Sequence, residues 1–259
     1  MTAWLFDVDG VITNPELKKA NPEIIEKLAA FLLKGDIIGL NTGRSLEFII
    51  EEVLKPLEEK SKDKKILKNV FSVGEKGGAW AIFNEGKLIQ SFDKSLKPPK
   101  VLEEKVKQIV KEYFSKTTFF DDTKKTMIST ELIKGVSLSE YSQDQERFVE
   151  FLEKIFNELG TDNFKIEPTL IATDIQNKKA GKDLGVQRFL DLIKGFHEPD
   201  EFETFGDSPA DMEMFRYLIK NKHKARFIYV GKKEIGNGEM IVKTEAKYDL
   251  GTLEYLSNH

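Results

Sequence analysis

Near its N-terminus the chain reads WLFDVDGV (residues 4–11), an apolar run that ends in two aspartates and a glycine. A short apolar run bounded by a turn signal is typical of a buried β-strand. Because successive side chains of a strand point in opposite directions, Asp7 and Asp9 lie on the same side and can face one site. Two carboxylates held close together repel unless a cation joins them, and Mg²⁺ prefers oxygen ligands. The plainer alternative is a turn in which the aspartate side chains bond to the backbone.

The composition excludes several classes of site and partner. The chain has 259 residues, no cysteine and a net charge of −4. The lack of cysteine excludes disulfides, thiolate catalysis and zinc–thiolate sites, and the scattered His197, His223 and His259 argue against a histidine metal site or triad. No basic excess points to nucleic acid or to an anionic membrane surface.

No apolar run approaches the length of a membrane span, and the early first strand leaves no room for a signal peptide. We therefore expect a cytoplasmic protein, and the sequence is silent on its oligomeric state.

Strands and helices alternate in both halves of the chain. Further short apolar strands are predicted at residues 37–40, 70–73, 202–205 and 227–230, with amphipathic helices between them. This alternation predicts an α/β fold with a doubly wound, Rossmann-like parallel sheet. Sites in such sheets form at the carboxyl ends of the strands.

The middle of the chain has a different pattern. After a break at Lys97-Pro98-Pro99, a helix and two strands occur twice over. We therefore predict an inserted α+β cap domain at residues 91–176, with residues 1–90 and 177–259 forming the core. The polar strand at residues 124–129 is our expectation for the cap face that meets a substrate, and a solvated strand is the alternative.

Chemically capable residues follow three of the predicted strands, and a lysine begins a helix between two of them. These residues are the Asp7/Asp9 pair, Thr42, Lys182 and the Asp207/Asp211 pair. Each has a plain alternative: a helix cap for Thr42, a surface charge for Lys182, and a turn and a helix-start acid for the last pair. Four separate plain explanations in one topology are less likely than one explanation, which is that these residues form a single site.

Taken in order, these segments resemble the haloacid dehalogenase superfamily of Mg²⁺-dependent phosphatases. The matching segments are DVDG at residues 7–10, NTGR at residues 41–44, Lys182, and GDSPAD at residues 206–211. The insert between the second and third segments resembles that of subfamily IIB, which includes sucrose-phosphate, mannosyl-3-phosphoglycerate and Cof-type sugar phosphatases. Val11, Ala210 and Lys76 depart from the common pattern, at positions that bear on metal affinity and substrate fit.

The resemblance implies a role for each matched residue. Asp7 would be the nucleophile, and Asp9 would be the general acid and base. Asp7, Asp207 and the backbone carbonyl of Asp9 would hold Mg²⁺. Thr42 and Lys182 would bind the transferred phosphoryl group, and Asp211 would hold Lys182 or the metal shell. Gly43 and Arg44 would complete the substrate-binding set.

The implied reaction is the hydrolysis of a small phosphorylated metabolite, a sugar phosphate or a sugar-acid phosphate, through an aspartyl-phosphate. Two alternatives stay open. One is a phosphomutase of the phosphomannomutase type, although the Thr42–Arg44 segment fits the phosphatases better. The other is a non-catalytic binding module on the same fold, against which the intact acids and lysine argue.

Overall fold

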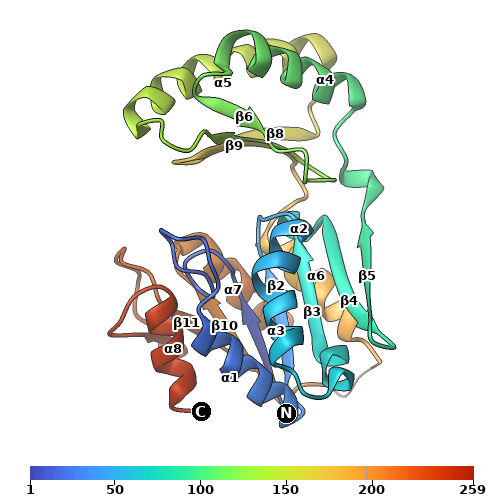
Figure 1. The fold of residues 1–259 in the computed structure, drawn as a ribbon, viewed down its shortest axis with the longest axis vertical. Coiled ribbons are helices and arrows are strands. Elements are labelled where there is room, and N and C mark those ends of the chain that lie inside the picture. The colour runs from blue at the N-terminus through green and yellow to red at the C-terminus, as the bar shows by residue number, and fades with distance from the viewer. Residues whose placement is uncertain (196–197) are drawn as a thin grey trace. The chain divides into compact units, whose positions relative to one another are not determined.

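The computed structural model describes residues 1–195 and 198–259, and the chain folds as two compact units. Unit 1 comprises Met1–Ser91 and Gly181–His259, and unit 2 comprises Phe92–Ala180 (Figure 1). His197 lies outside the described residues. The roles of unit 1 as a catalytic core and of unit 2 as its cap remain predictions.

Unit 1 is built on a sheet of eight strands in the order β12-β11-β10-β1-β2-β3-β4-β5. In chain order the strands are β1 (Thr2–Phe6), β2 (Ile37–Asn41), β3 (Val70–Gly74), β4 (Ala79–Asn84), β5 (Lys87–Phe92), β10 (Glu201–Gly206), β11 (Ala225–Tyr229) and β12 (Ile241–Lys243). All pairs from β12 to β3 are parallel, and β4 runs antiparallel to β3. Phe6, the last residue of β1, pairs with Phe205 of β10 and Leu40 of β2, so these three strands end together.

Helices cover both faces of this sheet, which confirms the predicted doubly wound α/β fold. One face carries α1 (Pro22–Leu33), α2 (Leu46–Ile49), α3 (Lys55–Lys60) and α8 (Asp249–Ser257), and the other carries α6 (Lys182–Ile193) and α7 (Met212–Lys220). A π-helical segment (Ile50–Leu54) joins α2 to α3.

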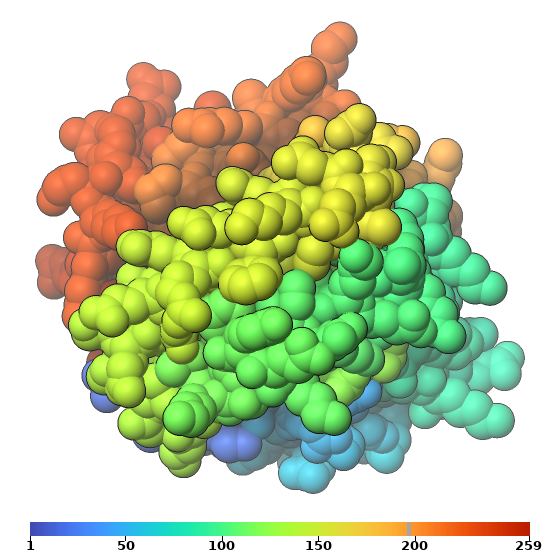
Figure 2. Space-filling view, turned by 90° about the horizontal axis from the view of Figure 1, so that it is seen from above, coloured from blue at the N-terminus to red at the C-terminus, as the bar shows by residue number. Residues whose placement is uncertain are grey.

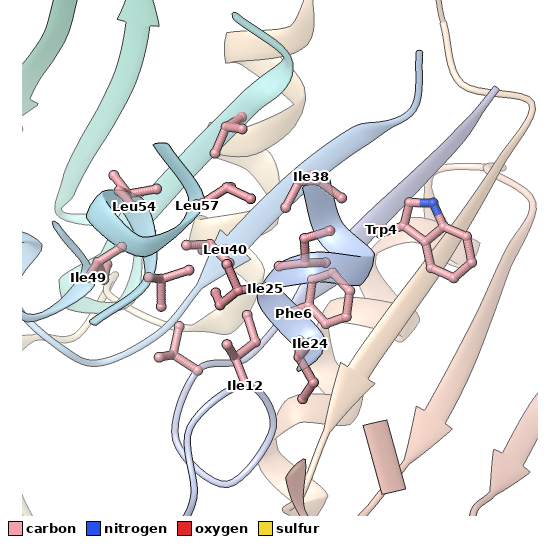
Figure 3. Close-up of a cluster of buried hydrophobic side chains, with 14 of the residues drawn as sticks. Trp4, Phe6, Ile12, Ile24, Ile25, Ile38, Leu40, Ile49, Leu54 and Leu57 are labelled. Atoms are coloured by element: carbon pink, nitrogen blue, oxygen red, sulfur yellow. The ribbon is translucent and has the colours of Figure 1, made fainter. Parts of the chain in front are cut away.

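The alternation of side chains along β1 explains the two layers. Trp4 and Phe6 enter the core cluster beneath α1, whereas Ala3 and Leu5 enter the cluster beneath α6 and α7. Figure 3 shows part of the first cluster, in which the strand side chains gather with those of α1. β1 is therefore buried on both faces, which holds the residues that follow it in place.

The start of α1 is fixed by its cap. The Asn21 side chain accepts a hydrogen bond from the Glu23 N–H at 3.0 Å, and Pro22 is the first helical residue. The helix gives way to Gly35, whose φ of +91° favours glycine. The sequence therefore determined both ends of this helix locally.

Unit 2 has an antiparallel sheet of four strands in the order β6-β7-β9-β8. These are β6 (Thr118–Phe120), β7 (Ile128–Leu132), β9 (Ala172–Asn177) and β8 (Phe164–Pro168). α4 (Lys100–Ile109) and α5 (Leu138–Leu159) pack on one face of this sheet around a separate core. Figure 2 looks onto these helices, with α4 in green and α5 in yellow-green.

α5 is longer than the sequence pattern indicates. It begins at Leu138 because Ser137 caps it, accepting a hydrogen bond from the Glu140 N–H at 3.2 Å. Its first two turns are mostly polar, so apolar periodicity did not reveal them.

Among residues 1–195 and 198–259, no helix combines the length and the apolar character needed to cross a bilayer.

Candidate active site

Four elements of unit 1 place polar side chains at the same edge of the sheet. Asp7 follows β1, Thr42 follows β2, and Asp207 follows β10, while Lys182 is the first residue of α6. The buried, parallel strands end together, so their following residues converge. Of the residues predicted for the site, the structure brings Asp7, Lys182, Asp207 and Asp211 into one cluster.

Lys182 joins two carboxylates at the centre of this cluster. Its Nζ lies 2.8 Å from Asp7 Oδ1 and 2.7 Å from Asp211 Oδ1, and it donates to the Asn41 carbonyl at 2.8 Å. Burial alone would lower the pKa of Lys182, but the carboxylates of Asp211 and Asp7 outweigh burial and raise it above its usual range. Lys182 is therefore a fixed positive charge beside Asp7.

Two of the aspartates have unusually high pKa values. Burial is the largest cause for Asp7, whose pKa rises to about 7 despite Lys182, with Asp211 and Asp9 adding repulsion. Burial, followed by the charge of Asp211, raises the pKa of Asp207 to about 6. Both carboxylates lack enough positive charge around them, which is the condition that a bound cation relieves.

The same acids have the arrangement of a metal site. Asp7, Asp207 and Asp211 each offer a carboxylate oxygen, and these atoms lie within 4.8 Å of one another. Asp211 is already committed, because it also accepts hydrogen bonds from the Ser208 N–H at 3.0 Å and hydroxyl at 2.7 Å. Asp7 and Asp207 are therefore the more available ligands, and an all-oxygen set suits a hard divalent cation.

Gly10 makes room for this arrangement. Its φ is +67°, and a Cβ built on it would lie 2.7 Å from Asp207 Oδ2. Glycine allows both the left-handed backbone and the close approach of the carboxylate. The turn after Asp9 is thus shaped to leave space for Asp207.

The Asp9 carboxylate turns toward Arg44 instead of joining this cluster. Arg44 Nε and Nη2 donate to its two oxygens at 2.7 and 2.8 Å, and Lys18 Nζ lies 3.9 Å away. Burial would raise the pKa of Asp9, but the Arg44 pair outweighs burial and lowers it. The sequence analysis placed Arg44 with the substrate and did not anticipate this pair.

A loop after β3 braces the segment that contains Thr42 and Gly43. The Thr42 hydroxyl accepts from the Arg44 N–H at 3.2 Å, the Glu75 N–H donates to the Arg44 carbonyl at 2.9 Å, and the Lys76 N–H donates to the Thr42 carbonyl at 3.0 Å. Glu75 and Lys76 adopt left-handed φ values of 50° and 53°, a strained geometry that positions these N–H groups. Gly43 lies against the Lys76 side chain.

Asn41 is a positioning residue that the sequence analysis quoted without giving it a role. Its Nδ2 donates to the Lys182 carbonyl at 2.8 Å while its own carbonyl accepts from Lys182 Nζ. A Cβ on Gly185 would lie 2.0 Å from Asn41 Oδ1, so the amide packs directly against α6. The available signal in the sequence was an asparagine directly after the apolar run at residues 37–40, and in the structure this asparagine is fully buried.

A family model described as haloacid dehalogenase-like hydrolase matches residues 4–220. The chain belongs to this family. The predicted superfamily and the prediction that the protein is a hydrolase are thereby confirmed, and none of the curated proteins compared matches the chain.

Solved structures share the whole fold at low sequence identity. The C-terminal domain of C. albicans trehalose-6-phosphate phosphatase is 18% identical with a TM-score of 0.68, and the match covers 99% of this chain and 91% of that one. The Synechocystis sucrose-phosphatase in complex with sucrose and phosphate is 13% identical with a TM-score of 0.55, and the match covers 99% of this chain and 96% of that one. The N-terminally truncated, IMP-bound IMP-nucleotidase of Plasmodium falciparum is 14% identical with a TM-score of 0.56. That match covers 99% of this chain and 67% of the nucleotidase chain. These similarities establish the fold.

Proposed function

We propose that this haloacid dehalogenase-like hydrolase is a Mg²⁺-dependent phosphatase that acts on a small phosphorylated metabolite through an aspartyl-phosphate. The observation that carries the proposal is the position of Asp7, which lies 2.8 Å from Lys182 Nζ and within 4.8 Å of the Asp207 carboxylate. A nucleophilic carboxylate and a phosphate ester are both anionic, so a phosphatase needs positive charge at this point.

Asp7 is the nucleophile of the proposed reaction. One of its carboxylate oxygens attacks phosphorus, the ester P–O bond breaks, and the leaving alkoxide takes a proton from Asp9. Lys182 pairs with the phosphoryl oxygens, and Asp211 keeps Lys182 in place through its 2.7 Å contact. Water is then deprotonated by Asp9 and attacks phosphorus, which releases inorganic phosphate and restores Asp7.

Magnesium would be held by Asp7, Asp207 and the Asp9 carbonyl, and it would supply the positive charge that offsets repulsion between Asp7 and the phosphate. The protein fits such an ion. Among the described residues, the carboxylates of Asp7, Asp207 and Asp211 lie within 4.8 Å of one another, and the one cation that pairs with any of them at less than 3 Å is Lys182. This cluster therefore has an excess of two negative charges, which a divalent cation would offset.

Arg44 has a second task in this proposal. It pairs with Asp9 in the substrate-free protein and keeps that carboxyl ionised. A phosphate dianion competes for the same guanidinium fork. When Arg44 turns to the phosphate, Asp9 loses its partner and can take up the proton that it later donates.

For the substrate we propose a sugar phosphate or a sugar-acid phosphate. Two of the similar structures are a trehalose-6-phosphate phosphatase domain and a sucrose-phosphatase. An IMP-nucleotidase also shares the fold, with a TM-score of 0.56 against 0.55 for the sucrose-phosphatase, so nucleoside monophosphates belong in any test.

The experiment is a phosphate-release assay of the full chain on a panel of sugar phosphates, sugar-acid phosphates and nucleoside monophosphates. Release with Mg²⁺, abolished by EDTA and by Asp7→Asn but kept in Asp191→Asn, supports the proposal; Asp191 is an exposed aspartate on α6. Absence of phosphate release from every ester, or equal release by Asp7→Asn, would overturn it. Transfer of the phosphoryl group to a second sugar hydroxyl would identify a mutase.

A further inference from the structure

Lys18, in the loop that follows β1, lies beside the proposed general acid with most of its hydrogen-bonding capacity unused. Its Nζ is 3.9 Å from Asp9 Oδ1, which is too long for a hydrogen bond, and Asp9 is its one ion-pair contact among the described residues. Both oxygens of Asp9 already accept hydrogen bonds from Arg44, at 2.7 and 2.8 Å. An ammonium has three N–H donors, so Lys18 can pair with a further acceptor close to Asp9.

The backbone holds Lys18 in this position. Two hydrogen bonds close the loop, from the Lys18 N–H to the Asn14 carbonyl at 2.9 Å and from the Asn14 N–H to the Lys19 carbonyl at 2.8 Å. Lys18 has a φ of +57°, a conformation that a lysine rarely adopts and that persists where surrounding contacts impose it. The adjacent Lys19 instead pairs with Glu52 at 2.5 Å, and 71% of its side chain is exposed. The two lysines thus have different partners, and Lys18 is the one beside Asp9.

Lys18 and Lys182 serve different parts of the proposed site. Burial raises the pKa of Asp9, Arg44 outweighs burial, and Lys18 adds to the lowering. For Asp7, burial raises the pKa and Lys182 is the main charge that opposes it. In the proposed function Asp7 receives the phosphoryl group and Asp9 gives a proton to the leaving oxygen. Lys182 is therefore the cation beside the nucleophile, and Lys18 is the cation beside the leaving group.

The distances indicate what part of a leaving group Lys18 can reach. A hydrogen bond from Asp9 to the ester oxygen would be about 2.7 Å long, so that oxygen would lie within roughly 7 Å of Lys18 Nζ. An ion pair between an ammonium and an anion spans about 3 Å. An anionic group one or two carbons from the ester carbon is therefore within reach, whereas a neutral sugar offers only hydroxyls there, which bind an ammonium less strongly.

We propose that Lys18 is a specificity-determining residue that pairs with a carboxylate on the leaving alcohol, close to the ester oxygen. The inference rests on the proposed function, because Asp9 marks the leaving-group side only in a phosphatase. A single ammonium matches the one charge of a carboxylate better than the charge of nearly two on a second phosphate. Of the two substrate classes proposed above, Lys18 thus favours the sugar-acid phosphate over the sugar phosphate.

The first arm of the test compares the hydrolysis of 2-phosphoglycerate and glycerol 2-phosphate by the full chain. These esters differ only in a carboxylate or a hydroxymethyl group beside the ester carbon. We expect wild type to have the higher kcat/KM for 2-phosphoglycerate, and the ratio of the two values should fall about fivefold in Lys18→Asn, as for a partly exposed ion pair. Asparagine tolerates a positive φ, so this variant removes the charge and keeps the loop.

Two further variants separate the charge of Lys18 from its place in the loop. Lys18→Arg keeps the charge and should retain most of the wild-type ratio. Lys19→Gln, the matched control in the same loop, should have the wild-type ratio. The difference between wild type and Lys18→Asn should also shrink at high salt, because salt screens a partly exposed ion pair. A structural role of Lys18 would not produce that salt dependence.

The second arm measures binding without turnover, so that a failure of this inference differs from a failure of the proposed function. Calorimetry with Mg²⁺ gives the Kd of each ester for Asp7→Asn and for Asp7→Asn/Lys18→Asn. We expect the Kd of 2-phosphoglycerate to rise about fivefold in the double variant and that of glycerol 2-phosphate to rise less.

The outcomes that overturn the inference are distinct. They are an equal kcat/KM ratio in wild type and Lys18→Asn, a fall in that ratio that Lys18→Arg shows as well, or an equal fall in Lys19→Gln. If wild type hydrolyses neither ester, the proposed function is not supported by this pair and the binding arm decides. Equal changes of both Kd values in the double variant, or no binding of 2-phosphoglycerate to Asp7→Asn, then overturn the inference.

Discussion

Removing the charge of Asp207 should stabilise the protein when no metal is bound. Its pKa rises from 3.8 to about 6 in the folded state, mainly through burial and then through the charge of Asp211. The folded state therefore holds this proton more tightly than the unfolded state, and stability is lost as the pH rises from about 4 through about 6. At pH 8 the full loss is present, and Asp207→Asn should recover it.

The size of the gain follows from the two pKa values. A carboxyl with these values loses at most about 3 kcal/mol of folding free energy on ionisation. Asp207 is only half-buried, and solvent screening reduces the gain to about 1–2 kcal/mol. For a chain of this size that is a rise in Tm of about 2–8 °C.

The assay is thermal unfolding of wild type and Asp207→Asn in EDTA and in Mg²⁺, at pH 8 and pH 4.5. In EDTA at pH 8 the variant should melt higher, and its advantage should shrink at pH 4.5, where the folded carboxyl is already protonated. Saturating Mg²⁺, at about 100 times its Kd, should raise the stability of wild type by about 2.7 kcal/mol and have little effect on the variant. Asp191→Asn is the matched control and should behave as wild type.

The test is whether wild type and Asp207→Asn exchange the order of their melting temperatures between EDTA and Mg²⁺. A variant that melts lower than wild type in EDTA would show that the Asp207 carboxylate is satisfied without a cation. An equal response of both proteins to Mg²⁺ would show that the ion binds elsewhere.

Two further substitutions test the contacts around the cluster. Lys182→Met leaves Asp7 and Asp211 buried without their shared cation, so the free energy of unfolding in urea and EDTA should fall by about 3–5 kcal/mol; a loss too small to measure would contradict the pairing. Gly10→Ala places a Cβ 2.7 Å from Asp207 Oδ2 at a φ of +67°, so Mg²⁺ affinity measured by calorimetry should fall about tenfold or more. Unchanged affinity would mean that Asp207 does not need its present position.

The order of elements in unit 1 was predictable because its signals are local. The Asn21 cap and the apolar run at residues 4–6 each specify their element from neighbouring residues. Polar residues directly after parallel strands must meet at one sheet edge, so the convergence of Asp7, Lys182 and Asp207 follows from the alternation of strands and helices. β12, with three residues, had too little apolar pattern to be recognised.

The partners of individual side chains were not predictable because they depend on tertiary placement. Arg44 reaches Asp9 only because β1 and β2 are neighbours and the loop after β3 sets the backbone of residues 42–44. The polar strand at residues 124–129 was expected to meet a substrate or solvent, and the burial of Lys124 beside Asp174 became visible only in the folded sheet. Spacing in sequence does not encode such contacts.

The measurement that tests the central claim most directly is a search for the aspartyl-phosphate. The full chain is mixed with a hydrolysed ester and Mg²⁺, quenched in acid, and digested for mass spectrometry, with hydroxylamine as the reagent that cleaves an acyl phosphate. We predict a hydroxylamine-sensitive phosphoryl group on the peptide that contains Asp7, absent from Asp7→Asn and present in Asp191→Asn. Turnover by Asp7→Asn at the wild-type rate, or a phosphoryl group on another residue, would contradict the claim.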